Sequence, residues 1–177
     1  RGGDRRGRPS FDRPKPEFEQ KMISIRRVTR VVSGGRRMSF AVAIAIGDKK
    51  GSLGVGTEKA GDTSLAINKA VRSARKQMIK ITLSKKGSIT HEVEAKYSSA
   101  SVMIRPNNGK GLVSGSATRD ILNLAGITNV TSKIHSGSKN KLNIARVTIK
   151  ALSKVATKRG AVEVKAPEAA VAAPVKE

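Results

Sequence analysis

Two strand-like segments, residues 28–32 and 39–46, flank a Ser-Gly-Gly-Arg-Arg turn and constrain the fold more than any other feature. The second segment alternates strictly between large apolar and small residues, the pattern of a strand with two different faces. The large face comprises Phe40, Val42, Ile44 and Ile46, and the small face comprises Ser39, Ala41, Ala43 and Ala45. Because glycine adopts positive φ without steric cost, Gly34-Gly35 is suited to reversing the chain. The sequence therefore predicts a β-hairpin with one core face and one face open to a close neighbour.

The hairpin is expected to belong to a small sheet covered by a helix. The alternation slips between Ile25 and Val28, which predicts a β-bulge near Arg26-Arg27. A short third strand over residues 52–55 leads into a glycine-punctuated loop, and Asp62 or Thr63 is suited to capping the helix that follows. The apolar stripe of that helix comprises Ile67, Ala70, Val71, Ala74, Met78 and Ile81, and the opposite stripe Lys69, Arg72, Lys76 and Lys80. We interpret the basic stripe as a solvated face, so this unit is a three-stranded antiparallel sheet plus a helix.

A second α+β unit is predicted after the Ser84–Gly87 break. Its expected elements are strands over 89–93 and 98–104, a helix over 116–124 closed by Gly126, a strand over 127–134, and a helix opening at Ser136-Gly137-Ser138. The apolar stripe of that last helix comprises Leu142, Ala145, Ile149, Leu152 and Ala156. The predicted bounds are 1–17 for a disordered basic arm, 18–84 and 88–158 for the two units, and 159–177 for a disordered tail. Units this small bury only about 60% of their unfolded surface, so each needs docking on the other or on a partner.

The charge balance points to a polyanionic partner. The chain of 177 residues carries 36 Lys and Arg against 13 Asp and Glu, a formal charge of +23. Such a chain repels itself unless a polyanion compensates it, and nucleic acid is the first candidate. Aromatic residues make up 2% of the chain, so base stacking cannot dominate, and structured RNA fits better than single strands. No apolar run has the length of about 20 residues that a membrane span needs, so we expect no membrane partner.

The sequence gives little basis for catalysis, metal binding or a cofactor. His91 and His135 are the only histidines and there is no cysteine, whereas metal and acid–base sites need clustered ligands or paired titrating groups. The absence of cysteine agrees with a cytoplasmic protein. Gly109-Lys110-Gly111, close to Gly115-Ser116, has the look of a phosphate-binding loop but matches neither the P-loop nor the dinucleotide motif. We interpret it as a packing turn or an RNA contact, and expect no enzyme and no cofactor.

The basic residues cluster where turns are predicted, which suits them to phosphate contacts. These cations are Arg36, Arg37, Lys49, Lys50, Lys85, Lys86, Lys110, Lys139 and Lys141. Arg26, Arg27 and Arg30 are interleaved with the first strand of the hairpin. Taken alone, the Arg36-Arg37 turn is equally compatible with a solvated turn that carries incidental charge. Two alternatives to a structural RNA-binding protein stay open: a free-standing RNA-binding regulator, and a nucleotide-binding enzyme that uses the Gly109–Gly111 loop.

Longer collinear motifs resemble the S-five family of small-subunit ribosomal proteins. The similarity covers residues 18–156. It is carried by Gly34-Gly35-Arg36-Arg37-x-Ser39-Phe40, Gly47-Asp48-x-x-Gly51-x-x-Gly54-x-Gly56-x-x-Lys59-Ala60, Ala66-Ile67-x-Lys69-Ala70, Gly109-x-Gly111-Leu112, Arg119, Leu124-Ala125-Gly126-Ile127 and Gly137-Ser138-x-Asn140. Glu58, where glycine is common, and Lys141, where proline is frequent, depart from the family pattern. The resemblance implies a double-stranded-RNA-binding-like N-terminal domain and a C-terminal domain with left-handed βαβ topology.

The resemblance also implies a place and a set of partners. It implies a structural constituent of the small ribosomal subunit, cytoplasmic and ribosome-bound, that supports assembly and accurate translation. It would bind ribosomal RNA near the mRNA entry and the head–body junction beside the proteins S-four and S-eight, and would not form a homo-oligomer. With the basic turns, the implied RNA-binding residues are Arg26, Arg27, Arg30, Ser33, Gly34, Gly35, Arg36, Arg37, Phe40, Lys49, Lys50, Lys59, Lys139 and Lys141. The implied protein-interface residues are Asn108, Gly109, Lys110 and Arg119.

Overall fold

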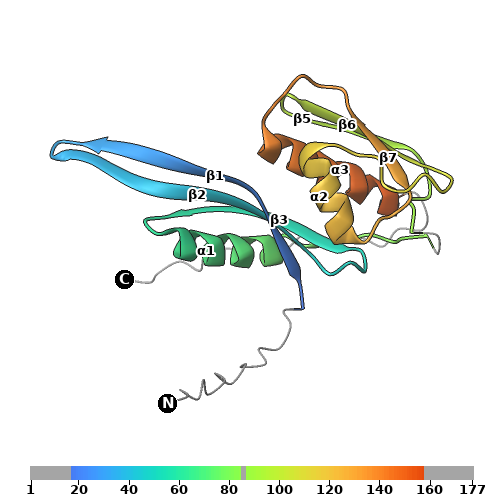
Figure 1. The fold of residues 1–177 in the computed structure, drawn as a ribbon, viewed down its shortest axis with the longest axis horizontal. Coiled ribbons are helices and arrows are strands. Elements are labelled where there is room, and N and C mark those ends of the chain that lie inside the picture. Colours follow the sequence, from blue (N-terminus) through green and yellow to red (C-terminus); the bar gives the residue numbers. More distant parts are fainter. Residues whose placement is uncertain (1–16, 85–86, 158–177) are drawn as a thin grey trace, which may run out of the picture.

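The computed structural model describes residues 17–84 and 87–157, which form two α+β units (Figure 1). The N-terminal unit contains β1 (Glu19–Val32), β2 (Gly35–Gly47), β3 (Ser52–Ala60), α1 (Thr63–Lys76) and β4 (Ile79–Lys80). The C-terminal unit contains β5 (Val93–Tyr97), β6 (Ala100–Pro106), α2 (Ser116–Ala125), β7 (Val130–Ile134) and α3 (Lys141–Thr157). The predictions for residues 1–16 of the arm, for Lys85-Lys86 and for the tail 159–177 fall outside the described residues.

The predicted hairpin is present as a long two-stranded ribbon. β1 and β2 pair antiparallel from Glu19 and Gly47 at one end to Val32 and Gly35 beside the turn. In Figure 1 the turn end of this ribbon projects beyond the rest of the N-terminal sheet and beyond the C-terminal unit. The short connection needs glycine because Gly35 has a φ of 130°.

The predicted bulge at Arg26-Arg27 is wrong, because the register shifts between Met22 and Ser24 instead. Ile23, the extra residue, turns into the core and is 6% exposed. Arg26 and Arg27 keep regular pairing with β2. Ile25 and Val28 are both exposed to solvent in this part of the ribbon, so no core requires them to lie on the same face of the strand. Their spacing was therefore no evidence of a bulge.

The predicted glycine-rich loop after residue 55 is also wrong, because β3 continues to Ala60. Gly54 and Gly56 lie on the face of the sheet that α1 covers. A Cβ on Gly56 would overlap the backbone of Ala70 and Ala74. Glycine here permits close helix–sheet packing. Around these contacts the large apolar side chains of β2 pack against the alanines of α1 and form a compact core. Its buried members are Val42, Ile44, Ile46, Ala66, Ala70 and Ala74.

The helix α1 is shorter than its apolar stripe predicted. It ends at Lys76, so Met78 and Ile81 are not helical residues. Instead the chain turns back and β4 pairs with the start of β3, which makes the sheet four-stranded in the order β1-β2-β3-β4. At the start of the helix, Asp62 occupies the N-cap position without a side-chain hydrogen bond. Met78 still packs on the core beneath α1, whereas Ile81 is buried in the apolar cluster that the two units share.

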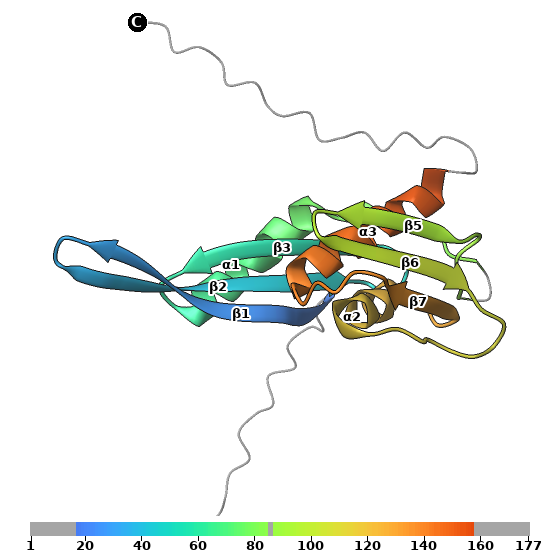
Figure 2. The same cartoon turned by 90° about the horizontal axis from the view of Figure 1, so that it is seen from above.

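The C-terminal unit is an antiparallel sheet, β5-β6-β7, with both helices on one face (Figure 2). The predicted strand over 89–93 is wrong, since Ile89 is buried in the core without pairing and β5 begins at Val93. The last helix begins at Lys141 rather than near Ser136, because Asn140 accepts a hydrogen bond from the Leu142 amide at 3.2 Å. As predicted, Gly126 closes α2 in the left-handed conformation, with a φ of 80°.

A parallel element is present beside α2, although the sheet itself is antiparallel. Val113, before the helix, forms a parallel bridge with Thr131, after it. This bridge, α2 and β7 together make a small βαβ connection. The left-handedness of this connection stays a prediction.

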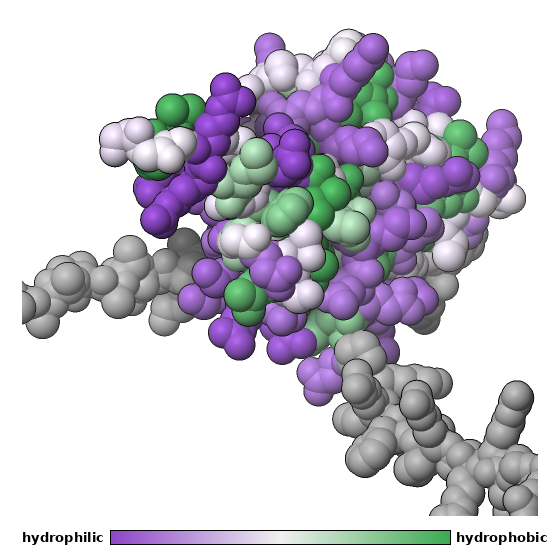
Figure 3. All heavy atoms as spheres, turned by 60° about the vertical axis from the view of Figure 1, so that its left-hand side comes forward, coloured by the Kyte–Doolittle hydropathy of each residue, from purple (hydrophilic) through white to green (hydrophobic). Residues whose placement is uncertain are grey.

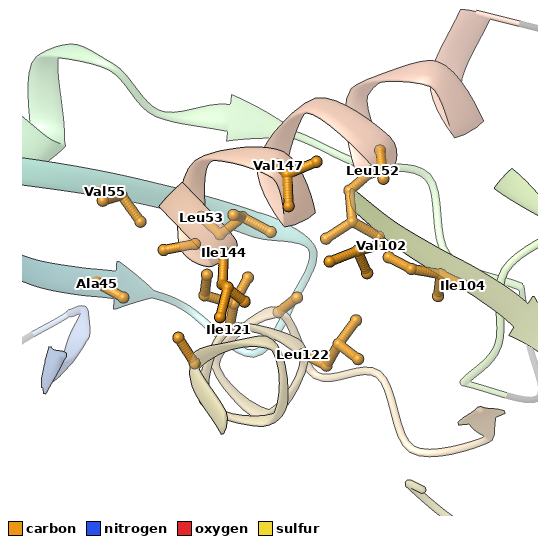
Figure 4. Packing of buried hydrophobic residues seen from close by; sticks show 14 of the residues in the cluster. Ala45, Leu53, Val55, Val102, Ile104, Ile121, Leu122, Ile144, Val147 and Leu152 are labelled. Carbon is orange, nitrogen blue, oxygen red and sulfur yellow. The ribbon is translucent and has the colours of Figure 1, made fainter. Parts of the chain in front are cut away.

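The two units share one core, with α2 and α3 lying between the two sheets (Figures 1 and 2). Figure 4 shows Ala45, Leu53 and Val55 of the N-terminal sheet facing α2 and α3. The small face predicted for β2 is thus covered by a close neighbour, and the Gly47 Cα packs directly on the Leu124 backbone. The α+β fold class is confirmed, and the units stabilise one another by a common apolar cluster.

The turn between β2 and β3 is the main polar connection between the units. The amides of Lys49 and Gly51 donate to the carbonyls of Leu124 and Ala125 at 2.9 and 3.1 Å, at the end of α2. Inside the turn, Asp48 Oδ1 accepts the amides of Lys50 and Ser52 at 2.7 and 2.9 Å. Burial raises the pKa of the Asp48 carboxyl, but the hydrogen bonds from Lys50 and Ser52 outweigh it and leave that pKa below 3.8.

We expect Asp48→Asn to lower the free energy of unfolding by about 0.5–1 kcal/mol at neutral pH. Because the folded-state pKa of Asp48 lies below its unfolded value, the carboxylate stabilises the fold above pH 3.8, and this contribution is lost as pH falls through the folded pKa. Urea unfolding should therefore separate wild type from Asp48→Asn at neutral pH and bring them together in acid. Asp62→Asn is the control, since Asp62 makes no side-chain cap bond. An unchanged gap in acid would contradict the prediction.

Candidate RNA interface

The register of β1 and β2 sorts the hairpin arginines onto two faces. Residues paired across an antiparallel ladder share a face, and alternate positions along each strand lie on the same side. Arg30 pairs with Arg37, Arg26 pairs with Ala41, and Lys59 of β3 also pairs with Ala41. All four cations therefore lie on the side of the sheet that carries Ala43 and Ala45. We call Arg26, Arg30, Arg37 and Lys59 the basic face.

The opposite face of the hairpin mixes cations with apolar side chains. Arg27 pairs with Phe40, and Arg36 pairs with Val31. Val31 is 76% exposed and Met38 is 50% exposed, while Phe40 is half-buried toward the α1 side. The two arginines at the Arg36-Arg37 turn thus point to different sides of the ribbon, which the sequence alone did not reveal.

A groove brings the predicted residues of the two units together. It has a volume of about 670 Å³ and is lined by the consecutive residues Met22 to Arg26 of β1 and by Lys139, Asn140 and Lys141. Because five consecutive residues of an outer strand line it, the groove follows the unpaired edge of β1. A neighbouring hollow of about 640 Å³ is lined by Arg30, Arg37 and Lys59, among others. Figure 3 shows that the side from which the hairpin projects is mostly hydrophilic, with apolar patches between the polar side chains.

The positive charge along this surface is not neutralised by the protein. Within residues 17–84 and 87–157, the ion pairs are Lys21 with Asp120 at 3.3 Å and Lys49 with Glu19. Both lie at the end of β1 remote from the turn. In the same described residues, no member of the basic face and neither Lys139 nor Lys141 pairs with a carboxylate. An excess of unpaired cations on one concave surface is the electrostatic footprint of a polyanion site.

The remaining predicted RNA-binding residues have different environments. Ser33, Gly34, Gly35 and Arg36 are exposed at the end of the ribbon. Lys49 belongs to the turn that docks on α2, its backbone is used in that docking, and its ammonium is paired with Glu19. Its backbone is held at a φ of 58°. Lys50, the next residue, is exposed. The main structural role of this turn is thus the contact between the two units.

The Gly109 loop forms a separate polar surface. Gly109 and Gly111 have positive φ, and Asn107 Nδ2 donates to the Gly111 carbonyl at 2.7 Å and to Thr131 Oγ1 at 3.1 Å. Asn108, Gly109, Lys110 and Arg119 are all exposed. In the part of the chain that the structure describes, no group of three or more His, Cys, Asp or Glu residues could hold a metal ion. The loop is thus a turn held from within, with no cation-binding cluster beside it.

Sequence reasoning missed the polar framework between the two units. Lys21 and Asp120 were not singled out, although they join β1 to α2. Nor did the sequence indicate that Met22 and Ser24 line the same groove as Lys139. The only signal for the Lys21–Asp120 ion pair in the sequence is that the two residues carry opposite charges. Such combinations are too common in a sequence to predict one particular ion pair. No described helix is long and apolar enough to cross a membrane.

This architecture, two small α+β units with a concave, uncompensated basic surface, defines a structural RNA-binding protein. The family model described as ribosomal protein S5, N-terminal domain, matches residues 18–82, and that of the C-terminal domain matches residues 95–166. The chain therefore belongs to the ribosomal protein S5 family, whose members are structural, non-catalytic proteins of the small ribosomal subunit.

Individual relatives support the same assignment. The chain is 40% identical to small ribosomal subunit protein uS5 of Mycoplasmopsis agalactiae over 90% of this chain and 69% of the relative. It is 40% identical to uS5 of Thermus thermophilus over 82% of this chain and 89% of the relative. It is 42% identical to uS5c of Cyanidium caldarium over 80% of this chain and 84% of the relative. The match spans 66% of the Mesomycoplasma hyopneumoniae uS5. The predicted α+β fold class, ribosome-bound localisation and non-enzymatic role are confirmed by this membership.

Proposed function

We propose that the chain binds small-subunit ribosomal RNA through the basic face and the Lys139–Lys141 loop, and so supports subunit assembly and accurate translation. The observation that carries this proposal is the groove that joins Arg26 to Lys139 and Lys141 across the two units. Because the units share one core, these cations are held in a fixed relation before RNA binds. A preorganised set of cations binds a shaped phosphate array with less entropic cost than flexible tails do.

The geometry favours structured RNA. A-form RNA presents phosphates and 2′-hydroxyls across a wide minor groove and is recognised largely by shape. The ribbon supplies a line of arginines, Arg26, Arg30 and Arg37, on one face, and the C-terminal unit supplies Lys139 and Lys141 beside Arg26. The turn residues Ser33, Gly34 and Gly35 carry small or absent side chains, so the backbone of the ribbon can approach RNA closely. Arg27, Arg36 and Phe40 would meet RNA on the other face.

The position on the ribosome is proposed from the family resemblance. We place the chain near the mRNA entry and the head–body junction, with S-four and S-eight as neighbouring proteins. The surface offered to these proteins is the exposed set Asn108, Gly109, Lys110 and Arg119 on the loop before α2 and on α2 itself. This surface does not overlap the residues that line the two basic grooves.

A tethered cleavage reagent tests the hairpin contact. The chain has no cysteine, so Ser33→Cys gives a unique attachment point for an iron–EDTA probe at the exposed turn. In purified small subunits we expect hydroxyl radicals from this site to cleave ribosomal RNA strongly within a few nucleotides. Ser64→Cys, exposed on α1, is the matched control and should give weaker cleavage at other nucleotides. Subunits that contain the Ser33→Cys protein but show no cleavage above the Ser64→Cys background would refute the proposal.

A further inference from the structure

The single tyrosine of the chain lies exposed at the end of β5, next to a turn that is hydrogen-bonded to the loop before α3. On β5, Val93 and Ala95 point into the core and are 5% and 3% exposed, and Tyr97 continues the same face one step further. Tyr97 is 36% exposed, so its ring projects past the end of the core. That face of the sheet carries α2 and α3 and looks toward the N-terminal unit (Figure 2).

Arg146 of α3 holds the Tyr97 ring in place. Its Nη1 donates to the Tyr97 hydroxyl at 3.1 Å, and its guanidinium carbon lies 5.8 Å from the ring centroid. The pair therefore forms a cation–π contact with a fixed phenol position. The next two helix cations, Lys150 and Lys154, differ because they donate to backbone carbonyls of β5, at Lys96 and Glu94. Of these three α3 cations, Arg146 is the one that contacts an aromatic ring.

The turn that carries Tyr97 is joined to the Lys139–Lys141 loop. Ser99 Oγ donates to Ser138 Oγ at 3.3 Å, and the Ser101 amide donates to Ser136 Oγ at 3.2 Å. The β5–β6 turn is kept small by serines, with Ser98 at a φ of 52°. Lys139 and Lys141 follow on the same loop, are exposed, and line the groove with Arg26. A held aromatic ring and unpaired cations thus occupy one end of the C-terminal unit.

We propose that Tyr97 and Arg146 form a stacking site for one unpaired base of ribosomal RNA, with Lys139 and Lys141 contacting the adjoining phosphates. Unpaired RNA bases stack on aromatic rings and on arginine planes, whereas paired bases in a duplex cannot. The site thus adds one single-stranded contact to a surface that otherwise binds shape and phosphate. The inference rests on the proposed RNA-binding function, with which it shares Lys139 and Lys141. The two stacking residues, Tyr97 and Arg146, have no part in that proposed function.

Ultraviolet cross-linking of purified small subunits tests the stacking site directly. Trypsin cleaves after Lys96 and Lys110 but not efficiently after Arg105, because Arg105 precedes Pro106. Digestion therefore releases the peptide 97–110, and we expect a nucleotide adduct on Tyr97, its first residue. Tyr97→Leu should remove the adduct and raise 2′-hydroxyl acylation about 5- to 100-fold at one unpaired nucleotide, the range expected from loss of one stacked base. Tyr97→Phe, which keeps the ring and loses the hydrogen bond to Arg146, should retain most of the protection.

Two controls separate stacking from structural effects and from the wider proposal. Lys150→Ala removes a cation that contacts the same strand and should leave the acylation pattern unchanged. Normal incorporation and normal Ser33→Cys cleavage show that the basic face is engaged. If both are normal while wild-type subunits give no adduct on Tyr97 in peptide 97–110, the stacking site is refuted and RNA binding by the basic face is not. A cross-link from Tyr97 to another ribosomal protein would also overturn it, by assigning this surface to a protein partner.

Discussion

Gly56→Ala is expected to destabilise the fold by about 3 kcal/mol or more, although it adds one methyl group. The new Cβ would overlap the Ala70 carbonyl oxygen and the Ala74 amide nitrogen, which are backbone atoms of α1. A flexible side chain could move aside, but a helix backbone can yield only by moving away from the sheet. That movement would open the core in which Val42 and Ile44 pack on the α1 alanines.

Chemical denaturation of Gly56→Ala beside Gly61→Ala measures this effect. Gly61 lies just before α1 and has open space where a Cβ would be placed, so its substitution should change stability by less than about 0.5 kcal/mol. Since the two units share one apolar cluster, we also expect one cooperative transition, with the loss at Gly56 appearing in signals from both units. Equal stabilities of the two variants would mean that the helix does not depend on close approach at this glycine.

The hairpin was predictable because several local signals agreed over β2. Phe40 to Ile46 alternate by size, and both faces are used as that alternation indicates, one against α1 and one against α2 and α3. Gly126 likewise closed a helix at the predicted residue. The predictions were wrong where one residue type is common in two different structural settings. Gly56 was interpreted as a loop residue, whereas it is a strand residue that lets a helix approach, and a sequence does not distinguish these two uses of glycine.

The candidate site was predictable in its residue types but not in its arrangement. Cations are visible in a sequence: Lys139 and Lys141 were identified at a predicted turn, and Arg26 within the first strand of the hairpin. Their meeting in one groove depends on how the C-terminal unit packs on the N-terminal sheet, which follows from long-range packing. The same packing explains Lys49, whose turn was expected to face RNA. Its backbone caps the end of α2 instead, a role that only the partner helix defines.

Replacing the basic face, Arg26, Arg30, Arg37 and Lys59, with glutamine is expected to weaken binding to small-subunit ribosomal RNA by roughly 10²- to 10³-fold near physiological salt. Each of these cations that neutralises a phosphate releases counterions on binding. The plot of log K against log salt should therefore become less steep by about 3 to 4. Filter binding over a series of KCl concentrations gives both numbers from one experiment, and a stability measurement confirms that the exposed substitutions leave the fold intact.

The matched control removes the same number of charges from the other side of the sheet. Lys69, Arg72 and Lys76 of α1 and Lys80 of β4 are exposed and lie outside both basic grooves. If attraction depended only on net charge, replacing these four with glutamine would reduce affinity and salt slope as much as changing the basic face. We expect a change of less than 10-fold and a slope altered by about 1 or less, because distant exposed charges are screened at about 8–10 Å. Equal losses from the two sets would show that RNA binding follows total charge, and that the groove between the two units has no special part in it.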